Sequence, residues 1–131
     1  MKKFTIIAII LTLVIIVGGV FLTSKGQDSD SSGSYPLPTE LTYYWGDGCP
    51  HCKIVEDFLE TWEKNLPAGR RGLKIDKKEV WNNVAYAKEL KARYEYCKVS
   101  QSEMGVPLLF TPEGKCYSGD TPIIDYLKNI K

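Results

Sequence analysis

Residues 45 to 53 read WGDGCPHCK, and this stretch holds two cysteines, Cys49 and Cys52, that are separated by two residues. The run before it, LTYYW at residues 41 to 45, is short and rich in β-branched and aromatic residues, which predicts a β-strand. The run after it, residues 50 to 64, has apolar residues at the spacing of one helix face. The cysteine pair therefore lies where a strand passes into a helix. The apolar positions of that helix are Ile54, Val55, Phe58, Leu59 and Trp62.

The first part of the chain is apolar and predicts a membrane anchor. Residues 4 to 22 carry no charge, and as a helix these 19 residues would measure roughly 28 Å, close to the ~30 Å hydrocarbon core of a bilayer. Lys2 and Lys3 precede them, and positive charge favours the cytoplasmic side, so residues 1–22 should cross the cell membrane once with the N-terminus inside. The alternative is a cleaved signal peptide, whose apolar region is usually about 7–15 residues. Under either interpretation the domain is extracytoplasmic. It stays anchored if residues 1–22 are retained, and it is secreted or periplasmic if they are cleaved.

The remainder divides into a linker and one domain. Residues 23 to 38 are polar, small and tipped with proline, and such a segment cannot bury enough apolar surface to fold, so we expect a flexible linker. Residues 39 to 131 have the composition of a globular domain, with 14 Lys and Arg residues against 14 Asp and Glu residues. This balance gives no support for nucleic-acid binding, which depends on a basic patch. We expect a monomer without a nucleic-acid partner.

The order of the predicted elements indicates the fold class. A strand–helix–strand unit predicts a parallel pair with a right-handed crossover, and the last two strands form a hairpin. The result is an α/β fold, with a four-stranded mixed sheet in the order β-α-β-α-β-β-α and helices on both faces. The expected strands are residues 41–45, 73–76, 106–110 and 115–118. The second helix is marked by Val80, Val84, Ala87, Leu90 and Tyr94, and the third has Thr121 as N-cap, Pro122 in its first position and Ile123, Ile124 and Leu127 on its buried face.

The position of the cysteine pair at a helix start suits thiol–disulfide exchange. The reacting species is the thiolate, and an ordinary cysteine with a pKa of ~8.5 is mostly protonated at neutral pH. A helix N-terminus presents free N–H groups and a partial positive charge, which would stabilise a thiolate at Cys49. Cys52 lies one turn further on the same side and can form a disulfide with Cys49. Pro50 fits the first turn, where its missing N–H is not needed, and His51 is either a cation that tunes Cys49 or a solvated loop residue.

The tetrapeptide C-P-H-C at a helix start, followed by G-V-P at residues 105–107 before a hairpin, resembles the thioredoxin superfamily. The C-P-H-C is most similar to that of bacterial envelope disulfide oxidoreductases of the DsbA type, and the resemblance covers residues 39 to 131. It implies a thioredoxin-like fold in which Cys49 is the nucleophile and Cys52 resolves the mixed disulfide.

The resemblance also assigns roles to Val106 and Pro107 in the G-V-P motif. It implies that Pro107 is cis and that Val106 and Pro107 bind substrate, with the main-chain groups around Val106 free to pair with a bound peptide. The alternative for Pro107 is an ordinary edge-strand proline. The chain departs from the family at Tyr43, where many members carry a buried carboxylate, so a group that takes the proton of Cys52 is not evident.

Cys97 and Cys116 are the other two cysteines of the chain. In an exported domain two further cysteines are expected to pair, and closing a loop of about 20 residues would stabilise the domain by roughly 3 kcal/mol. We therefore expect a structural disulfide. The alternatives are a second redox pair, which passes electrons to or from Cys49, and free thiols.

We expect no metal, and no cofactor apart from the redox-active Cys49–Cys52 disulfide. The spacing C-x-x-C can form half of a zinc site, but the other half needs two more ligands at similar spacing. Cys97 and Cys116 are 19 residues apart, and His51 is the only histidine.

These observations together predict a membrane-anchored thiol–disulfide oxidoreductase that faces outside the cytoplasm. Its catalytic residues would be Cys49, Cys52, His51 and Pro50, and its partners would be thiols or disulfides of exported proteins, or a membrane redox partner. The C-P-H-C motif favours an oxidase over a reductase. The alternative is a non-catalytic module, tethered to the membrane by residues 4–22, that binds a metal or a client protein through the same cysteines.

Overall fold

A mixed β-sheet forms the centre of the domain. In the computed structural model, which describes residues 35–70 and 73–130, its strands are β1 (Leu41–Trp45), β2 (Ile75–Glu79), β3 (Leu108–Phe110) and β4 (Cys116–Ser118). Their order is β2–β1–β3–β4. Strand β1 is parallel to β2 and antiparallel to β3, and β3 is antiparallel to β4. The predicted α/β fold with a four-stranded mixed sheet is confirmed.

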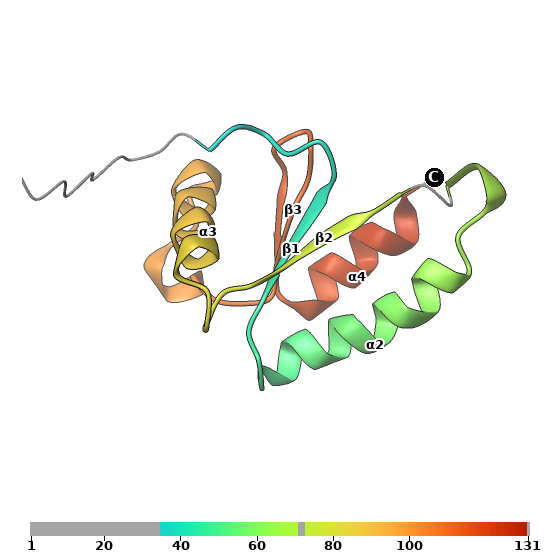
Figure 1. Ribbon diagram of the computed structural model, residues 1–131, viewed down its shortest axis with the longest axis horizontal. Coiled ribbons are helices and arrows are strands. Elements are labelled where there is room, and N and C mark those ends of the chain that lie inside the picture. The colour runs from blue at the N-terminus through green and yellow to red at the C-terminus, as the bar shows by residue number, and fades with distance from the viewer. Residues whose placement is uncertain (1–34, 71–72, 131) are drawn as a thin grey trace, which may run out of the picture. The chain divides into compact units, whose positions relative to one another are not determined.

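Helices cover both faces of the sheet, as the order of the elements predicts. They are α2 (Pro50–Lys64), α3 (Val84–Cys97) and α4 (Asp120–Asn129). Helices α2 and α4 lie side by side on one face, and α3 lies on the other (Figure 1). Two short 3-10 turns, η1 (Ala68–Arg70) and η2 (Gln101–Glu103), belong to the connections.

The side chains of β1 alternate between two apolar clusters because successive residues of a strand point to opposite faces. Tyr43 packs in the cluster under α2 and α4, and Tyr44 packs in the cluster under α3. The first cluster contains Leu41, Tyr43, Val55, Leu59, Leu109, Ile123 and Leu127. The second contains Tyr44, Val80, Leu90, Tyr94, Leu108 and Phe110.

The second strand lies further along the chain than the predicted residues 73–76. Strand β2 pairs with the whole of β1, and its Lys77 and Lys78 have no apolar pattern. Their ammonium groups instead reach the carboxylates of Glu63, at 3.4 Å, and Glu89, at 2.7 Å. Charged side chains suit an edge strand, and they hide the alternation by which a strand is recognised in a sequence.

Strands β3 and β4 are shorter than the predicted residues 106–110 and 115–118. Pro107 has no N–H to donate to a ladder, and the pairing of β3 with both neighbours begins at Leu108. The carbonyl of Lys115 accepts a hydrogen bond from the Thr111 N–H at 2.9 Å in the turn between the strands.

Some predicted helix faces are wrong. Val84 is the first residue of α3 and is 72% exposed, and Val80 is buried but precedes the helix. Ile54 in α2 is 49% exposed, so it lies outside the buried stripe of that helix. The buried face of α3 includes the charged residue Arg93, whose guanidinium donates a hydrogen bond to the Tyr44 hydroxyl. A search for apolar residues at helical spacing does not mark this position as buried.

The last helix begins earlier than predicted. Helix α4 starts at Asp120 with Gly119 as its N-cap, rather than at Pro122 with Thr121 as N-cap. Gly119 has φ +90, a conformation that glycine adopts without a steric penalty. The Asp120 carboxylate accepts a hydrogen bond from the Thr121 N–H at 2.8 Å and places negative charge at the positive end of the helix. Ile124 is half-buried, whereas Ile123 and Leu127 are buried as predicted.

The predicted anchor, residues 1–22, lies outside the described residues, as does most of the predicted linker. Within residues 35–70 and 73–130, no helix has both the length and the apolar character needed to cross a membrane. The described end of the linker segment contacts α3, because the main-chain oxygens of Tyr35 and Pro36 accept hydrogen bonds from the Arg93 guanidinium at 3.2 and 2.9 Å.

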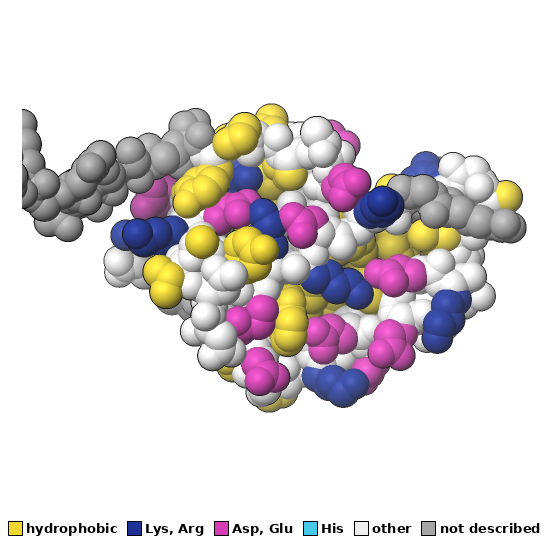
Figure 2. All heavy atoms as spheres, viewed as in Figure 1, with side chains coloured by type: hydrophobic (Ala, Val, Ile, Leu, Met, Phe, Trp, Pro, Cys, Tyr) yellow, Lys and Arg dark blue, Asp and Glu magenta, His cyan; other side chains and the backbone are white. Residues whose placement is uncertain are grey.

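Charged side chains of both signs are interspersed on the face shown in Figure 2, in keeping with the balanced composition of the domain. Some form exposed pairs, such as Lys53 with Asp57 on α2. Exposed pairs of this kind each contribute little to stability because water screens them.

Candidate functional site

The Cys49–Cys52 disulfide lies at the start of α2. The two residues are bonded, their Cα atoms are 5.2 Å apart, and both are buried. Cys49 is the N-cap of the helix, and its sulfur accepts a hydrogen bond from the Cys52 N–H at 3.2 Å. Pro50 occupies the first helical position and is exposed. The sulfur of Cys49 therefore lies at the positive end of the helix dipole, where negative charge would be stabilised after reduction.

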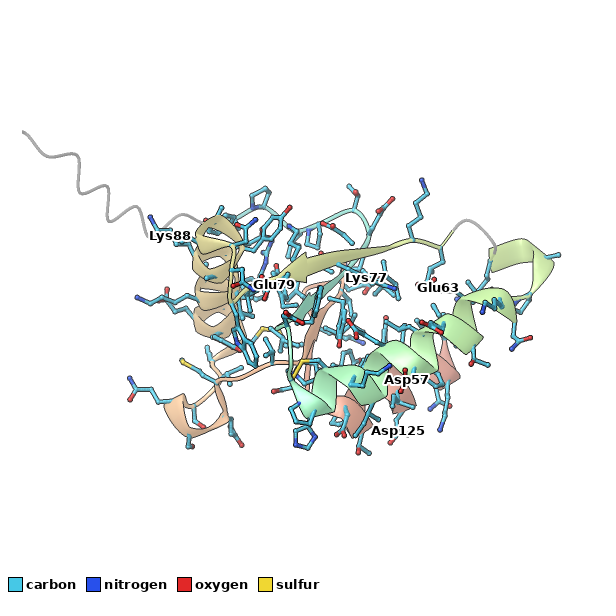
Figure 3. The ribbon with its side chains drawn as sticks, turned by 60° about the horizontal axis from the view of Figure 1, so that its bottom comes forward. Asp57, Glu63, Lys77, Glu79, Lys88 and Asp125 are labelled. Atoms are coloured by element: carbon cyan, nitrogen blue, oxygen red, sulfur yellow. A yellow bond between two sulfur atoms is a disulfide. The ribbon has the colours of Figure 1, made fainter. Side chains whose placement is uncertain are left out.

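The loop before Cys49 is held from two directions. The Gly46 carbonyl accepts a hydrogen bond from the Cys49 N–H at 3.1 Å. The carboxylate of Glu79, at the end of β2 (Figure 3), accepts hydrogen bonds from the N–H groups of Asp47 at 3.3 Å, Trp81 at 2.9 Å and Asn82 at 2.8 Å. Desolvation would raise the pKa of Glu79, but these N–H donors outweigh it and lower the pKa. A carboxylate from a neighbouring strand thus joins two loops beside the disulfide.

Val106 and Pro107 lie against the disulfide, as the resemblance implies. The peptide bond between them is cis, and Pro107 is buried. The Val106 carbonyl oxygen is 3.6 Å from the Cys49 sulfur, a distance at which a Cys49 thiol could donate a weak hydrogen bond. The Pro107 carbonyl is taken by the Gly119 N–H at 2.9 Å. Within the described part of the chain, the Val106 N–H has no main-chain acceptor.

His51 is exposed, and its ring is tied to the start of α4. Its Nδ1 atom is 3.1 Å from the Asp120 Oδ2 atom. This hydrogen bond lowers the pKa of Asp120, and the Thr121 N–H lowers it further. The contact orients the imidazole through Nδ1, so Nε2 is the nitrogen left for other partners. Asp120 is 69 residues from His51, and sequence reasoning did not find it.

Tyr43 lies beneath the disulfide, at the position where the family resemblance leads one to expect a carboxylate. The side chain is buried, and its hydroxyl donates a hydrogen bond to the Cys52 carbonyl oxygen at 3.2 Å. Burial, together with the nearby charge of Glu56, raises the pKa of Tyr43. The hydroxyl therefore stays neutral at physiological pH and acts as a donor that holds the first turn of α2.

Cys97 and Cys116 form a second disulfide that joins the end of α3 to β4. Their Cα atoms are 6.2 Å apart, and both residues pack against the apolar cluster under α3. The expected pairing is confirmed, and its structural role stays a prediction.

In the described ranges, no three His, Cys, Asp or Glu side chains are grouped so that they could hold a metal ion. Comparison of the chain with protein-family models and with curated proteins found no match in either set.

Proposed function

We propose that this chain is a thiol–disulfide oxidoreductase with a thioredoxin-like fold, whose redox centre is the Cys49–Cys52 disulfide. The observation that carries the proposal is the placement of the Cys49 sulfur. It caps α2, accepts the Cys52 N–H at 3.2 Å and lies 3.6 Å from the Val106 carbonyl. A helix N-terminus lowers the pKa of a thiol, and a stabilised thiolate makes the corresponding disulfide oxidising.

The exchange proceeds in two steps in the oxidising direction. A substrate thiolate attacks the Cys49 sulfur, a disulfide joins substrate to protein, and Cys52 leaves as a thiolate that takes a proton from water. A second substrate thiolate then attacks the substrate sulfur of this mixed disulfide, and Cys49 leaves as a thiolate. The substrate loses two electrons as its disulfide forms, and the protein gains them as its own disulfide is reduced.

The substrate is a polypeptide in this proposal, and it binds beside Cys49 in an extended form. The Val106 N–H, which has no main-chain acceptor among residues 35–70 and 73–130, and the Val106 carbonyl offer main-chain groups to such a segment, a form of strand addition. Residues 4–22 would anchor the chain in the cell membrane with the domain outside the cytoplasm. Exported proteins are then the substrates, and a membrane-bound redox partner reoxidises the dithiol.

Trapping of intermediates tests the proposal. Full-length oxidised protein should oxidise a synthetic dithiol peptide, and Cys49→Ala should abolish the reaction. Cys52→Ala leaves Cys49 as a free thiol, so with the disulfide form of the same peptide it should accumulate a mixed disulfide through Cys49, which mass spectrometry would detect. Retained turnover in Cys49→Ala would contradict the proposal. An inactive wild-type protein that is purified with stoichiometric zinc would instead support a metal-binding module.

The direction of electron flow follows from the reduction potential measured against glutathione. We expect an oxidase, with a potential near about −120 mV. A value near or below about −270 mV would indicate a reductase fed by a membrane electron donor.

A further inference from the structure

Trp81 lies against the loop that leads into the redox disulfide. Its ring covers Gly46 so closely that a Cβ atom at Gly46 would overlap it, and Gly46 is three residues before Cys49. The Val80 N–H donates to the Trp45 carbonyl at 2.9 Å, which holds the loop after β2 beside the end of β1. One side of the ring is therefore covered by main chain, yet Trp81 remains 58% exposed.

The main chain of Trp81 is held in place. Its N–H donates to the Glu79 carboxylate at 2.9 Å, and the same carboxylate accepts the Asp47 N–H of the redox loop at 3.3 Å. A ring supported in this way loses little conformational entropy when it contacts a ligand. Single exposed apolar residues are common on proteins, so the exposure alone decides nothing.

The position of Trp81 at one end of the sheet indicates what its exposed ring can contact. Trp45 pairs with Glu79 on β2, and Tyr44 pairs with Leu108 on β3, so β1 lies between these strands. Trp81 follows the paired end of β2 by two residues, and Val106 precedes the paired start of β3 by two. The ring and the Val106 main chain therefore flank the β1–α2 loop on opposite sides, at the same end of the sheet. A polypeptide whose sulfur lies at Cys49 would therefore have the Val106 main chain on one side and the Trp81 ring on the other.

We propose that Trp81 is a specificity-determining residue, which contacts an apolar or aromatic side chain close to the reacting cysteine of the substrate polypeptide. This inference rests on the proposed function, because it assigns a substrate class to the same redox centre. Aromatic rings contribute large rigid contact areas at low entropy cost, and a polypeptide with an apolar neighbour gains that contact. Glutathione lacks such a side chain and would not use the ring.

Peptide oxidation by the full-length protein tests the inference. Two dithiol peptides would be compared that differ only beside the first cysteine, with leucine in one and serine in the other, together with glutathione. The wild type should prefer the leucine peptide. Trp81→Ala should lower kcat/KM for that peptide about tenfold, the loss expected for one apolar contact, and should change glutathione oxidation less than twofold. Trp81→Phe keeps a flat ring and should retain most of the preference.

Two further variants separate contact from folding. Gly46→Ala displaces the ring without removing it, and it should weaken the preference for the leucine peptide. Val84→Ala removes another exposed apolar side chain three residues further on and should change nothing. Equal losses toward both peptides and glutathione in Trp81→Ala, or an unchanged preference, would overturn the inference. A wild type that fails even with glutathione would overturn the proposed function, whereas a wild type active without preference would overturn only the role of Trp81.

Discussion

The two disulfides are the same chemical bond in two different settings. Cys49 and Cys52 are three residues apart, and the Cys49 sulfur already accepts a main-chain N–H at the start of α2. Cys97 and Cys116 are 19 residues apart and join the end of α3 to the edge strand β4. Both pack on the face of the sheet that α3 covers, opposite to the face under α2 and α4. The first setting stabilises the reduced form, because a thiolate at Cys49 would lie at a helix N-terminus. The second setting restrains the chain.

The two disulfides differ less in the stability that they confer than in the environment of their sulfur atoms. In the chain-entropy estimate, a loop of about 4 residues gives about 2 kcal/mol and a loop of about 20 residues gives about 3 kcal/mol. Loop length alone therefore distinguishes the bonds weakly. The environment of the leaving sulfur distinguishes them strongly, because exchange is faster when the leaving thiol has a lower pKa.

The largest expected effect is in the rate of reduction. Dithiothreitol should reduce Cys49–Cys52 faster than Cys97–Cys116 by a factor on the order of 100, since Cys49, which leaves in the second step of the exchange, leaves as a thiolate stabilised by the helix N-terminus. Quenching with a thiol label at intervals, followed by peptide mapping, would measure both rates. Similar rates would remove the distinction between the two settings and would support a second redox pair at Cys97 and Cys116.

Removal of the second disulfide should change stability rather than exchange. The double variant Cys97→Ala with Cys116→Ala should lose about 3 kcal/mol of unfolding free energy in urea. Its rate of peptide oxidation should stay within about twofold of the wild type, because Cys49 keeps its place at the N-terminus of α2. The matched control, Cys49→Ala with Cys52→Ala, should lose about 2 kcal/mol and all exchange. Loss of exchange in the first variant, with the fold intact, would contradict the assignment.

Glu89 offers a second test on the face that carries Cys97–Cys116. Its carboxylate accepts hydrogen bonds from the Lys78 ammonium at 2.7 Å and from the Tyr44 hydroxyl at 2.8 Å, and it contacts the buried Arg93 guanidinium. Glu89→Ala leaves these groups without their anion and should cost about 2 kcal/mol, below the 3–5 kcal/mol typical of fully buried pairs. Urea unfolding measures the cost, and peptide oxidation should be unchanged. A neutral effect on stability would show that water replaces the carboxylate.

The smallest effect should come from Glu79, whose carboxylate accepts a hydrogen bond from Asp47 in the loop before Cys49. Hydrogen bonds from Asn82, Trp81 and Asp47 overcome its desolvation and hold its pKa below the ordinary 4.5. Its contribution is therefore complete above pH 4.5 and is lost as pH falls through the lower folded-state value. Glu79→Gln should lower Tm by a few degrees at pH 6 and flatten the dependence of Tm on pH below 4.5. Parallel curves for variant and wild type would exclude this role.

The sequence by itself determined the local features of this protein. The aromatic run before Gly46, the proline after Cys49 and the helical spacing of Val55 and Leu59 together located the strand–helix junction, because each signal depends on neighbouring residues. The same kind of signal predicted the mixed sheet and the helices on both faces. Residues that follow each other in the chain define a helix N-terminus, so the setting of Cys49 could be anticipated.

Only the tertiary structure decided which distant groups surround the cysteines. His51 contacts Asp120 across 69 residues, and Asp47 contacts Glu79 across 32. The full length of β2 was missed as well, because Lys77 and Lys78 pair with carboxylates on helices instead of following an apolar pattern. Such contacts arise from the order and register of the strands, which bring separate segments to one end of the sheet. Local periodicity carries no information about them, because it reports which face of an element is buried and not which element covers it.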